Sequence, residues 1–366
     1  MIGVRCGLIA LAAWLSFSVW PALGGDAFGT AGRFRGIGIV VPKNCGVPTQ
    51  QQMQGACDPP KVSPELPTAE RAAAHVKRAR ELVLLLRVET AYEDATAAIA
   101  ADPSSIAARV FRIRLAMSQM PSEEILKDFR AAFQLAPRDP YLLATHAEWM
   151  LQQDAKIALQ DVSAAMQILR AEDQDMLFIR GRAFMELDRY EDAKRDFDRA
   201  LALEPDDTRI WQVRAQLHLR YGKFAPAIAD ASALLDRRFD IKTQEVRALA
   251  YIALGRHQEA IEDLTAVLGK PGQPGAISAT FPQFNRLLIQ RAILSMNVGR
   301  PDDATRDLDF IVGTGGPRAI LRMQLYLKKN GFSDVAVDGN RSTGFDDAIK
   351  ACFINQACGR GLVRSI

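Results

Sequence analysis

The chain is short of aromatic residues and of net charge. Phe, Trp and Tyr make up 7% of its 366 residues, and the formal net charge is +3. Aromatic side chains are enriched in strands, so their scarcity beside abundant Ala and Leu favours helices. A net charge this small gives no reason to expect nucleic acid or an anionic membrane as a partner.

The sequence also lacks the common signatures of catalysis. It contains no GxSxG elbow, no GxxxxGK(S/T) phosphate loop and no HExxH pair, and "GIGIV" at residues 36–40 lacks the third glycine of a dinucleotide-binding loop. Its four histidines fall in separate segments and share no metal-ligand spacing: His75, His146, His218 and His257. We therefore expect a protein that is not an enzyme, with no catalytic residues, no cofactor and no metal site.

Beyond residue 24 no apolar segment approaches the length of a membrane span. The one long apolar run, "GLIALAAWLSFSVWPALG" at residues 7–24, follows Arg5 and closes on Ala22 and Gly24. Small residues at those two positions suit a signal peptidase, so residues 1–24 are predicted to be a cleaved secretory signal. The alternative is an N-terminal membrane anchor, for which the run is short. Cleavage predicts a secreted protein, periplasmic or extracytoplasmic, with no transmembrane segment left.

Cysteine is sparse as well. The chain has five, and removal of Cys6 with the signal leaves Cys45, Cys57, Cys352 and Cys358, an even number in a compartment that permits disulfides. Four cysteines allow three pairings, and the close spacings favour Cys45 with Cys57 and Cys352 with Cys358. None of the CxxC spacings of a four-thiolate zinc site is present, so disulfides are expected rather than a metal.

What the sequence does contain is a pattern of about 34 residues. Counted from residue 174, Gly181, Ala193, Ala200 and Pro205 stand at positions 8, 20, 27 and 32. Units beginning at 208, 241 and 285 repeat the small residues, and weaker units in phase begin at 72, 106 and 140. This pattern resembles the tetratricopeptide repeat over residues 72–318, with about seven units, or six if one of the degenerate units is not a repeat.

The resemblance implies an all-α fold in which helical hairpins stack into a right-handed superhelix with a concave inner groove. Gly181 and Ala193 would let the two helices of a unit approach closely. Pro205 would end the second helix, because proline has no N–H to donate. The charges of "RYEDAKRDFDRALALEP" at residues 189–205 are then expected to face water: Glu191, Asp192, Lys194, Arg195, Asp196, Asp198 and Arg199.

In the tetratricopeptide family the first helix of each unit lines the groove, and the resemblance implies a partner-binding row there: Arg114, Glu148, Arg182, Glu186, Gln216 and Arg220, with Arg80 at its start. Guanidinium groups bind carboxylates in a two-point fork, so this row suits an extended peptide or a terminal carboxylate. Alternatively these side chains pair with one another, as Arg182 and Glu186 can at one turn apart. Later units place Leu249, Ile252 and Ile293 there, which predicts an apolar end of the groove.

The carboxyl-terminal residues differ from the repeats. The segment "ILRMQLYLKKNGFSDVAVDGNRSTGFDDAIKACF" at 320–353 resembles the small three-helix peptidoglycan-binding domain of bacterial wall enzymes and envelope proteins, through these residues: Gln324, Gly331, Phe332, Asp338 and Gly339. Ser342 and Phe345 depart from the glycine and threonine usual in that family. The resemblance implies a three-helix domain over residues 319–366 with peptidoglycan as its ligand. The alternative is a unit that only caps the last repeat.

Residues 25–71 are rich in Gly, Pro and Gln and are predicted to form a linker with a disulfide-closed loop. Together these segments predict a non-catalytic bacterial cell-envelope adaptor. It would bind a protein or peptide partner in its groove and be placed at the cell wall by its last domain. The alternatives are a pure protein-interaction module, whose last unit is a cap, or an accessory part of a wall hydrolase.

Overall fold

The computed structural model describes residues 59–85, 87–117, 122–274 and 284–365. The predicted signal peptide, the linker as far as residue 58 and the expected Cys45–Cys57 bridge lie outside the described residues. Within them the regular structure is helical except for one short antiparallel ladder, β1 (Gly269–Lys270) with β2 (Gln273–Pro274). The expected all-α class is confirmed in this respect. Among the described helices none combines the length and apolarity needed to cross a membrane.

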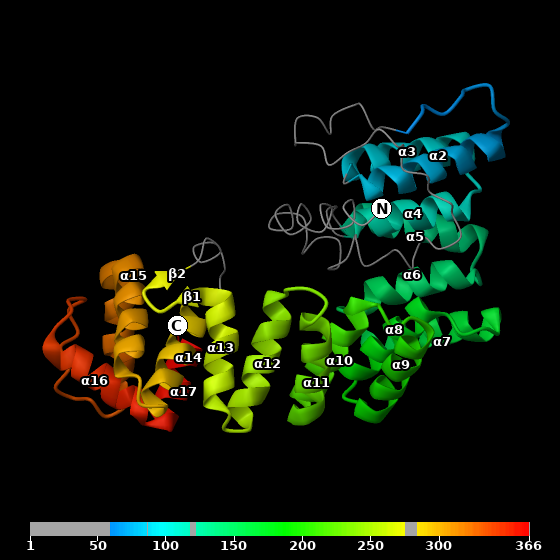
Figure 1. Ribbon diagram of the computed structural model, residues 1–366. Helices are drawn as coiled ribbons and strands as arrows, with labels where there is room; N and C mark the ends of the chain where they lie inside the picture. Colours follow the sequence, from blue (N-terminus) through cyan, green and yellow to red (C-terminus); the bar gives the residue numbers. More distant parts are fainter. Residues whose placement is uncertain (1–58, 86, 118–121, 275–283, 366) are drawn as a thin grey trace. The chain divides into compact units, whose positions relative to one another are not determined.

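Successive helices form hairpins, each of which can be followed by colour in Figure 1. The pairs are α2 (Thr68–Leu84) with α3 (Val88–Ala101), α4 (Ile106–Ala116) with α5 (Ser122–Leu135), α6 (Pro140–Met150) with α7 (Ala155–Leu169), α8 (Gln174–Glu186) with α9 (Tyr190–Leu203), α10 (Thr208–Arg220) with α11 (Phe224–Leu235), α12 (Ile241–Ala253) with α13 (His257–Leu268), and α14 (Phe284–Asn297) with the first part of α15 (Pro301–Lys329). The chain divides into two compact units, residues 1–213 and 214–366, with the boundary inside α10.

Capping residues recur where the first helices begin. The side chains of Ser105, Asp139, Asp173 and Asp240 each accept a hydrogen bond from the N–H three residues further on, at 2.7 to 3.3 Å. Asp207, at the equivalent place before α10, accepts from the N–H of Arg209. A cap satisfies N–H groups that have no partner within the helix, so these residues fix where the hairpins start.

Within the hairpin of α8 and α9 the two backbones are close because a glycine faces a large ring. A Cβ on Gly181 would stand 2.6 Å from Cε1 of Phe197, nearer than carbon atoms approach. Phe197 is fully buried, as are Ala193 and Ala200 on the same face of α9. The close packing of α8 against α9 therefore requires a residue without a side chain at position 181.

A charge pair crosses most hairpins at the same two positions. In five of the hairpins that the structure describes, an arginine donates from Nε and a terminal nitrogen to both oxygens of an aspartate sixteen residues on, at 2.5 to 2.9 Å. We call these the Arg–Asp ladder: Arg112–Asp128, Arg180–Asp196, Arg214–Asp230, Arg247–Asp263 and Arg291–Asp307, preceded by the single contact of Arg78 with Asp94.

The ladder corrects one expectation from the sequence. Asp196 was expected to face water with its neighbours, but its exposed fraction is 4% because it lies on the buried face of α9 beside Phe197. The bond to Arg180 makes this burial tolerable, since a buried carboxylate needs a partner charge and hydrogen bonds. The other charges of that segment include the exposed pair Arg195–Asp192 and the half-buried pair Lys194–Asp198.

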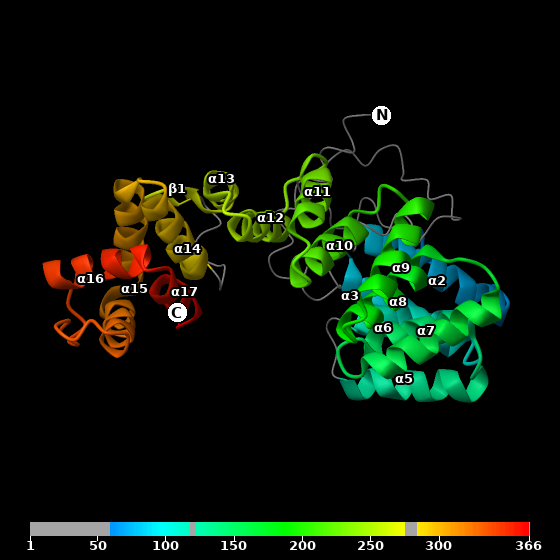
Figure 2. The ribbon, with the colours of Figure 1, turned by 90° about the horizontal axis from the view of Figure 1, so that it is seen from below.

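The carboxyl-terminal helices share one core with the last two hairpins. Helix α15 bends at Gly316, whose φ of 57° and ψ of −157° are not helical, and continues from Pro317 to Lys329. Helices α16 (Thr343–Ile354) and α17 (Gln356–Ser365) pack against α14 and α15, as Figures 1 and 2 show. A continuous cluster of buried side chains runs from Ala248 to Leu362. The last residues thus form a covering layer on the seventh hairpin.

Candidate functional site

The Arg–Asp ladder shows which face of each first helix points away from the second helices. Arg180 turns toward α9, and Arg182 lies two residues further on, a rotation of roughly 200° around the helix. Side chains in the position of Arg182 therefore lie on the opposite face, which we call the groove face. In the unit of residues 1–213 the groove face carries Arg80, Arg114, Glu148 and Arg182.

Two arginines of the groove face reach toward the next hairpin. The guanidinium carbon of Arg80 lies 5.8 Å from the ring centroid of Phe111 on α4, within cation–π range. Nε of Arg114 donates to Oγ1 of Thr145 on α6 at 3.2 Å. Arg80 and Arg114 thus each bridge one hairpin to the following one, which places their charges in a row along the groove face.

Arg80 carries a positive charge that its surroundings leave poorly compensated. Burial, and next the charge of Arg114, lower the pKa of Arg80 below its usual value. Its Nε is buried without a hydrogen-bond partner, and within the described part of the chain no carboxylate lies at ion-pair distance from it. A bound anion would therefore stabilise the charged form of Arg80.

Arg182 lies further along the same unit, over the ring of Phe178. Its guanidinium carbon is 5.8 Å from that ring's centroid, and the buried Arg209 approaches the same ring at 5.3 Å. Arg209 is held by Asp207 and Asp175, so it is part of the structural framework. Arg182 is half-buried and Glu186 is exposed, one turn further along α8.

The unit of residues 214–366 has a more apolar groove face. Gln216 is half-buried and Arg220 is exposed on α10, with the guanidinium of Arg220 6.0 Å from the ring of Tyr221. On α12 and α14 the equivalent positions hold Leu249, Ile252 and Ile293, all half-buried. The residues expected at the apolar end thus do not lie deep in the core.

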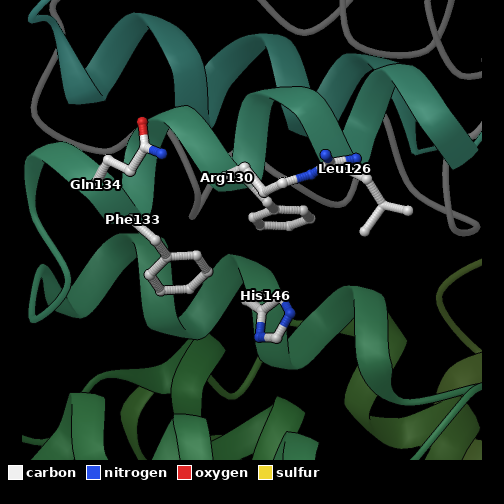
Figure 3. Close-up of a pocket in the computed structure, with 6 residues that line it drawn as sticks. Leu126, Arg130, Phe133, Gln134 and His146 are labelled. Carbon is white, nitrogen blue, oxygen red and sulfur yellow. The ribbon is translucent and has the colours of Figure 1, made fainter.

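The unit of residues 1–213 also has a hollow that we did not predict from the sequence. A depression of about 390 Å³ lies between α5 and α6, lined by Leu126, Phe129, Arg130, Phe133, Gln134 and His146 (Figure 3). The ring of His146 meets Phe129 and Phe133 edge to face, with centroids 4.9 and 5.3 Å apart. His146 stands where other hairpins have the ladder arginine, and its Nδ1 lies 2.6 Å from Oδ2 of Asp161. His146 therefore faces away from the groove face. The sequence feature that could have drawn attention to this place is a histidine at the position where Arg112 and Arg180 stand in the neighbouring units.

Three of the five residues predicted to form the peptidoglycan-binding motif lie together: Gln324, Asp338 and Gly339. Nε2 of the buried Gln324 donates to Oδ1 of Asp338 at 3.0 Å and to the carbonyl of Asn340 at 2.8 Å. Its Oε1 accepts from the N–H groups of Asp338 and Gly339, at 3.1 and 2.8 Å. These bonds use the full capacity of the amide. The N–H of Asn340, with help from Gln324, lowers the pKa of Asp338.

The other two motif residues lie at the end of α15. Gly331 has a φ of 99°, which an L side chain rarely adopts, and Phe332 packs half-buried against the core. All five residues therefore have positions that the fold itself explains.

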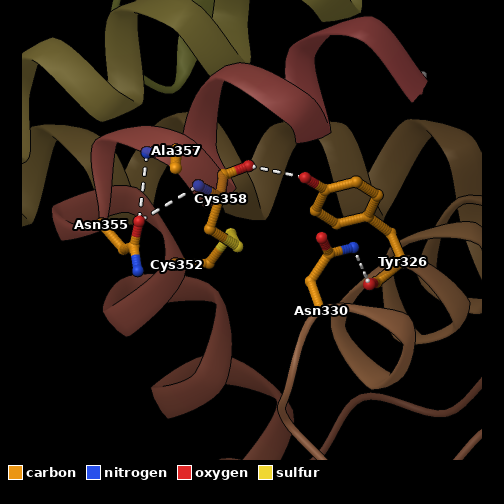
Figure 4. Close-up of a disulfide and its surroundings, with 6 residues drawn as sticks. All are labelled: Tyr326, Asn330, Cys352, Asn355, Ala357 and Cys358. Atoms are coloured by element: carbon orange, nitrogen blue, oxygen red, sulfur yellow. Dashed lines mark hydrogen bonds between the residues drawn. A yellow bond between two sulfur atoms is a disulfide. The ribbon is translucent and has the colours of Figure 1, made fainter.

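The disulfide expected near the end of the chain is present. Cys352 at the end of α16 is bonded to Cys358 in α17, and both are buried (Figure 4).

Two segments of the chain match the tetratricopeptide repeat family, residues 175–207 and residues 242–269. The chain therefore contains tetratricopeptide repeats, as the spacing predicts. A search of curated proteins finds no match.

A search of solved structures finds matches of low sequence identity. PilW, described as a widely conserved type IV pilus biogenesis factor, is 14% identical with a TM-score of 0.50, over 54% of this chain and 91% of that one. PilF of Pseudomonas aeruginosa is 17% identical with a TM-score of 0.46, over 55% and 91%. A tetratricopeptide repeat protein from Parabacteroides merdae is 18% identical with a TM-score of 0.45, over 76% and 97%. At 14% identity the likeness to PilW shows the fold alone.

Proposed function

We propose that this protein is a non-catalytic adaptor of the bacterial cell envelope that holds a protein partner on the groove face of its repeats. Tetratricopeptide repeats act in general in protein–protein interaction, which supports the class of function. The leader expected over residues 1–24 supports secretion across the inner membrane to the periplasm. Docking is reversible and involves no covalent step.

The observation that carries the proposal is the state of Arg80 beside Arg114. Two guanidinium groups follow one another along the groove face, and Arg80 has neither a carboxylate nor a partner for its Nε in the described chain. A carboxylate from outside relieves the repulsion between the two charges. The matching partner is an extended acidic segment or a chain end with a free carboxylate. Each planar guanidinium group can bind both oxygens of one carboxylate.

Neighbouring aromatic rings add to this site. Phe111 and Phe178 lie under the guanidinium groups of Arg80 and Arg182, so each cation is held in place before a partner arrives. Groups that are already ordered lose little conformational entropy on binding. A hydrogen bond to a charged group contributes about 1.5–3 kcal/mol, so the loss of one arginine is expected to weaken binding by about ten-fold or more.

The test is affinity capture from an envelope extract with the mature chain as bait. The Arg80→Glu/Arg114→Glu double variant is expected to lose the captured partner. Arg195→Glu makes the same charge change on an exposed side chain of α9 and serves as the matched control. Equal recovery of the partner by all three baits would refute the proposed groove.

For the last three helices, the geometry favours the role of a cap. The amide of Gln324 is bonded to Asp338, Gly339 and Asn340, and α16 and α17 share the core of the last hairpins. Repeat arrays need their final apolar surface covered. We propose peptidoglycan placement as the second candidate, and pelleting of the protein with purified wall sacculi distinguishes the two. If the protein stays in the supernatant at low and moderate salt, the role of a cap is supported. If it co-sediments with the sacculi, wall placement is supported.

A further inference from the structure

The last hairpin has a groove face of its own, on α14. Arg291 turns toward α15 and α13, where it is bonded to Asp307 and to the carbonyl of Gly269. Ile293 lies two residues further on, and the helix rotation of about 100° per residue places it on the opposite face. Ile289 and Met296 flank Ile293 on that face, so it is apolar from Ile289 to Met296, while Arg286, two turns before Ile293, is bonded to Glu245 of α12.

Helix α17 lies against Ile293 of that stripe. The backbone at Gly359 is so near that an added Cβ would lie 3.0 Å from Cδ1 of Ile293. Leu362 is fully buried and Val363 is half-buried against the same core. At Gly361 the Oη atom of Tyr326 leaves no room for a Cβ. Small residues thus bring the backbone of α17 onto its neighbours, with aliphatic side chains beside them.

A disulfide and hydrogen bonds hold the start of α17 in this place. The Cys352–Cys358 bond ties its first turn to α16, and Oη of Tyr326 donates to the carbonyl of Cys358 at 2.9 Å (Figure 4). Oδ1 of Asn355 caps the start of α17 by accepting from the N–H groups of Ala357 and Cys358. The helix has ten residues, a length at which an isolated helix is marginal in water. Its retention therefore depends on packing and on the disulfide.

We infer that α17 is an internal ligand of the groove face on α14, and that the class of partner recognised there is an amphipathic helix with small residues at the contact and aliphatic residues beside them. The inference extends the proposed function, on which it rests, by assigning a second, apolar subsite. A partner helix of this kind competes with α17. The backbone tethers α17 to α16 and so gives it a high effective concentration at its own site, and the disulfide further restricts where its first turn can lie.

The test uses the full-length protein and a fluorescein-labelled synthetic peptide of residues 355–366 that carries Cys358→Ser. The disulfide-bonded protein is expected to bind this peptide at least about ten-fold more weakly than the Cys352→Ser/Cys358→Ser variant does, because the tethered helix already occupies the site. Adding Ile293→Asp to that variant is expected to abolish binding. Leu325→Asp, an equal change at a side chain 54% exposed on α15, is the matched control and is expected to leave binding unaltered.

A second measurement guards against a variant that fails to fold. Reduction of the unmodified protein, followed by reoxidation, is expected to raise and then restore the hydrogen exchange of the α17 amides while α14 stays protected. Unchanged exchange on reduction, equal peptide affinity with and without the disulfide, or binding that survives Ile293→Asp would each overturn the inference. None of these measurements depends on Arg80 or Arg114, so failure here and failure of the proposed groove in the first unit can be told apart.

Discussion

Arg291 on α14 donates from Nε and Nη2 to the two carboxylate oxygens of Asp307 on α15, at 2.8 and 2.7 Å. Their exposed fractions are 1% and 0%, which makes this the most buried pair of the Arg–Asp ladder. Burial raises the pKa of Asp307 above its usual value although Arg291 opposes the shift. The pair therefore exists at a substantial desolvation cost, and its members depend on each other.

The dependence can be measured by a double-mutant cycle. Asp307→Leu is expected to lower the free energy of unfolding by about 3–5 kcal/mol, because it leaves the charge of Arg291 buried without its partner. The double variant Arg291→Met/Asp307→Leu is expected to recover much of the loss, although the carbonyl of Gly269 then lacks its donor. Denaturant titration of these two variants, of the single variant Arg291→Met and of the unmodified protein gives the coupling energy.

An exposed pair supplies the control for that cycle. Arg189, just before α9, and Asp192, in its first turn, have side-chain exposures of 51% and 27%, and removing either is expected to change stability by less than about 1 kcal/mol. A double variant at 291 and 307 that is no more stable than Asp307→Leu would contradict the account of the buried pair.

Gly181 is expected to tolerate no side chain. Gly181→Ala would put a methyl group 2.6 Å from the ring of Phe197, and overpacking of this kind costs about 1–3 kcal/mol. Gly181→Leu is expected to cost more and to lower the melting temperature by several degrees. Thermal unfolding followed by circular dichroism measures both variants.

Gly313 provides the matched helical glycine, because outside its own helix backbone and chain neighbours no described atom lies within 4 Å of the place its Cβ would take. Gly313→Ala is expected to be neutral or to stabilise by up to about 1 kcal/mol, since alanine favours helix. If Gly181→Ala proved as harmless as Gly313→Ala, the close approach of α8 and α9 would be wrong.

The turn after α15 is expected to depend on Gln324. Gln324→Leu keeps the volume but leaves the N–H groups of Asp338 and Gly339 without their acceptor, at a cost of about 1–3 kcal/mol for each group that stays buried. Hydrogen exchange at residues 338–340 is expected to rise. Gln167→Leu changes an exposed glutamine of α7 and is expected to leave stability nearly unchanged. Intact protection in Gln324→Leu would show that the amide does not brace the turn.

The same turn is expected to loosen in acid. The pKa of Asp338 is lowered in the folded protein, so its ionised form is favoured by folding. That stabilisation is complete above the ordinary pKa of aspartate, about 3.9, and is lost as the pH falls through the lower folded value. Amide chemical shifts of Gly339 and Asn340 should report the transition, and Asp338→Asn should remove it. A transition that persists in Asp338→Asn would assign it to another carboxyl group.

Much of the fold could be predicted from spacing alone. The small residues around Gly181, Ala193 and Ala200 indicated hairpins of the tetratricopeptide kind, and two segments of the chain match that family. The prediction failed at Asp196, where charge was equated with exposure. Asp196 lies three residues after Ala193 and four before Ala200, so helical periodicity already placed it on the buried face of α9. The recurrence of arginines 34 residues apart, as at Arg180 and Arg214, was a second sign of a repeated structural position.

The candidate site was harder to predict. The sequence placed Arg80, Arg114 and Arg182 at equivalent positions. It did not predict the contact of Arg80 with Phe111 or its repulsion from Arg114. Those depend on how one hairpin is set against the next. The hollow beside His146 depends likewise on side chains from α5 and α6 meeting in space.

The sequence by itself determined the helical class and the recurrence of the hairpins, because both follow from composition and local spacing along the chain, and it favoured the pairing of Cys352 with Cys358 without deciding it. Only the tertiary structure decided that Gln324 holds the turn at Asp338, that Arg291 and Asp307 form a buried pair, and that α17 lies on Ile293. These contacts join residues on different helices, and packing and desolvation decide them once the backbone has brought the helices together.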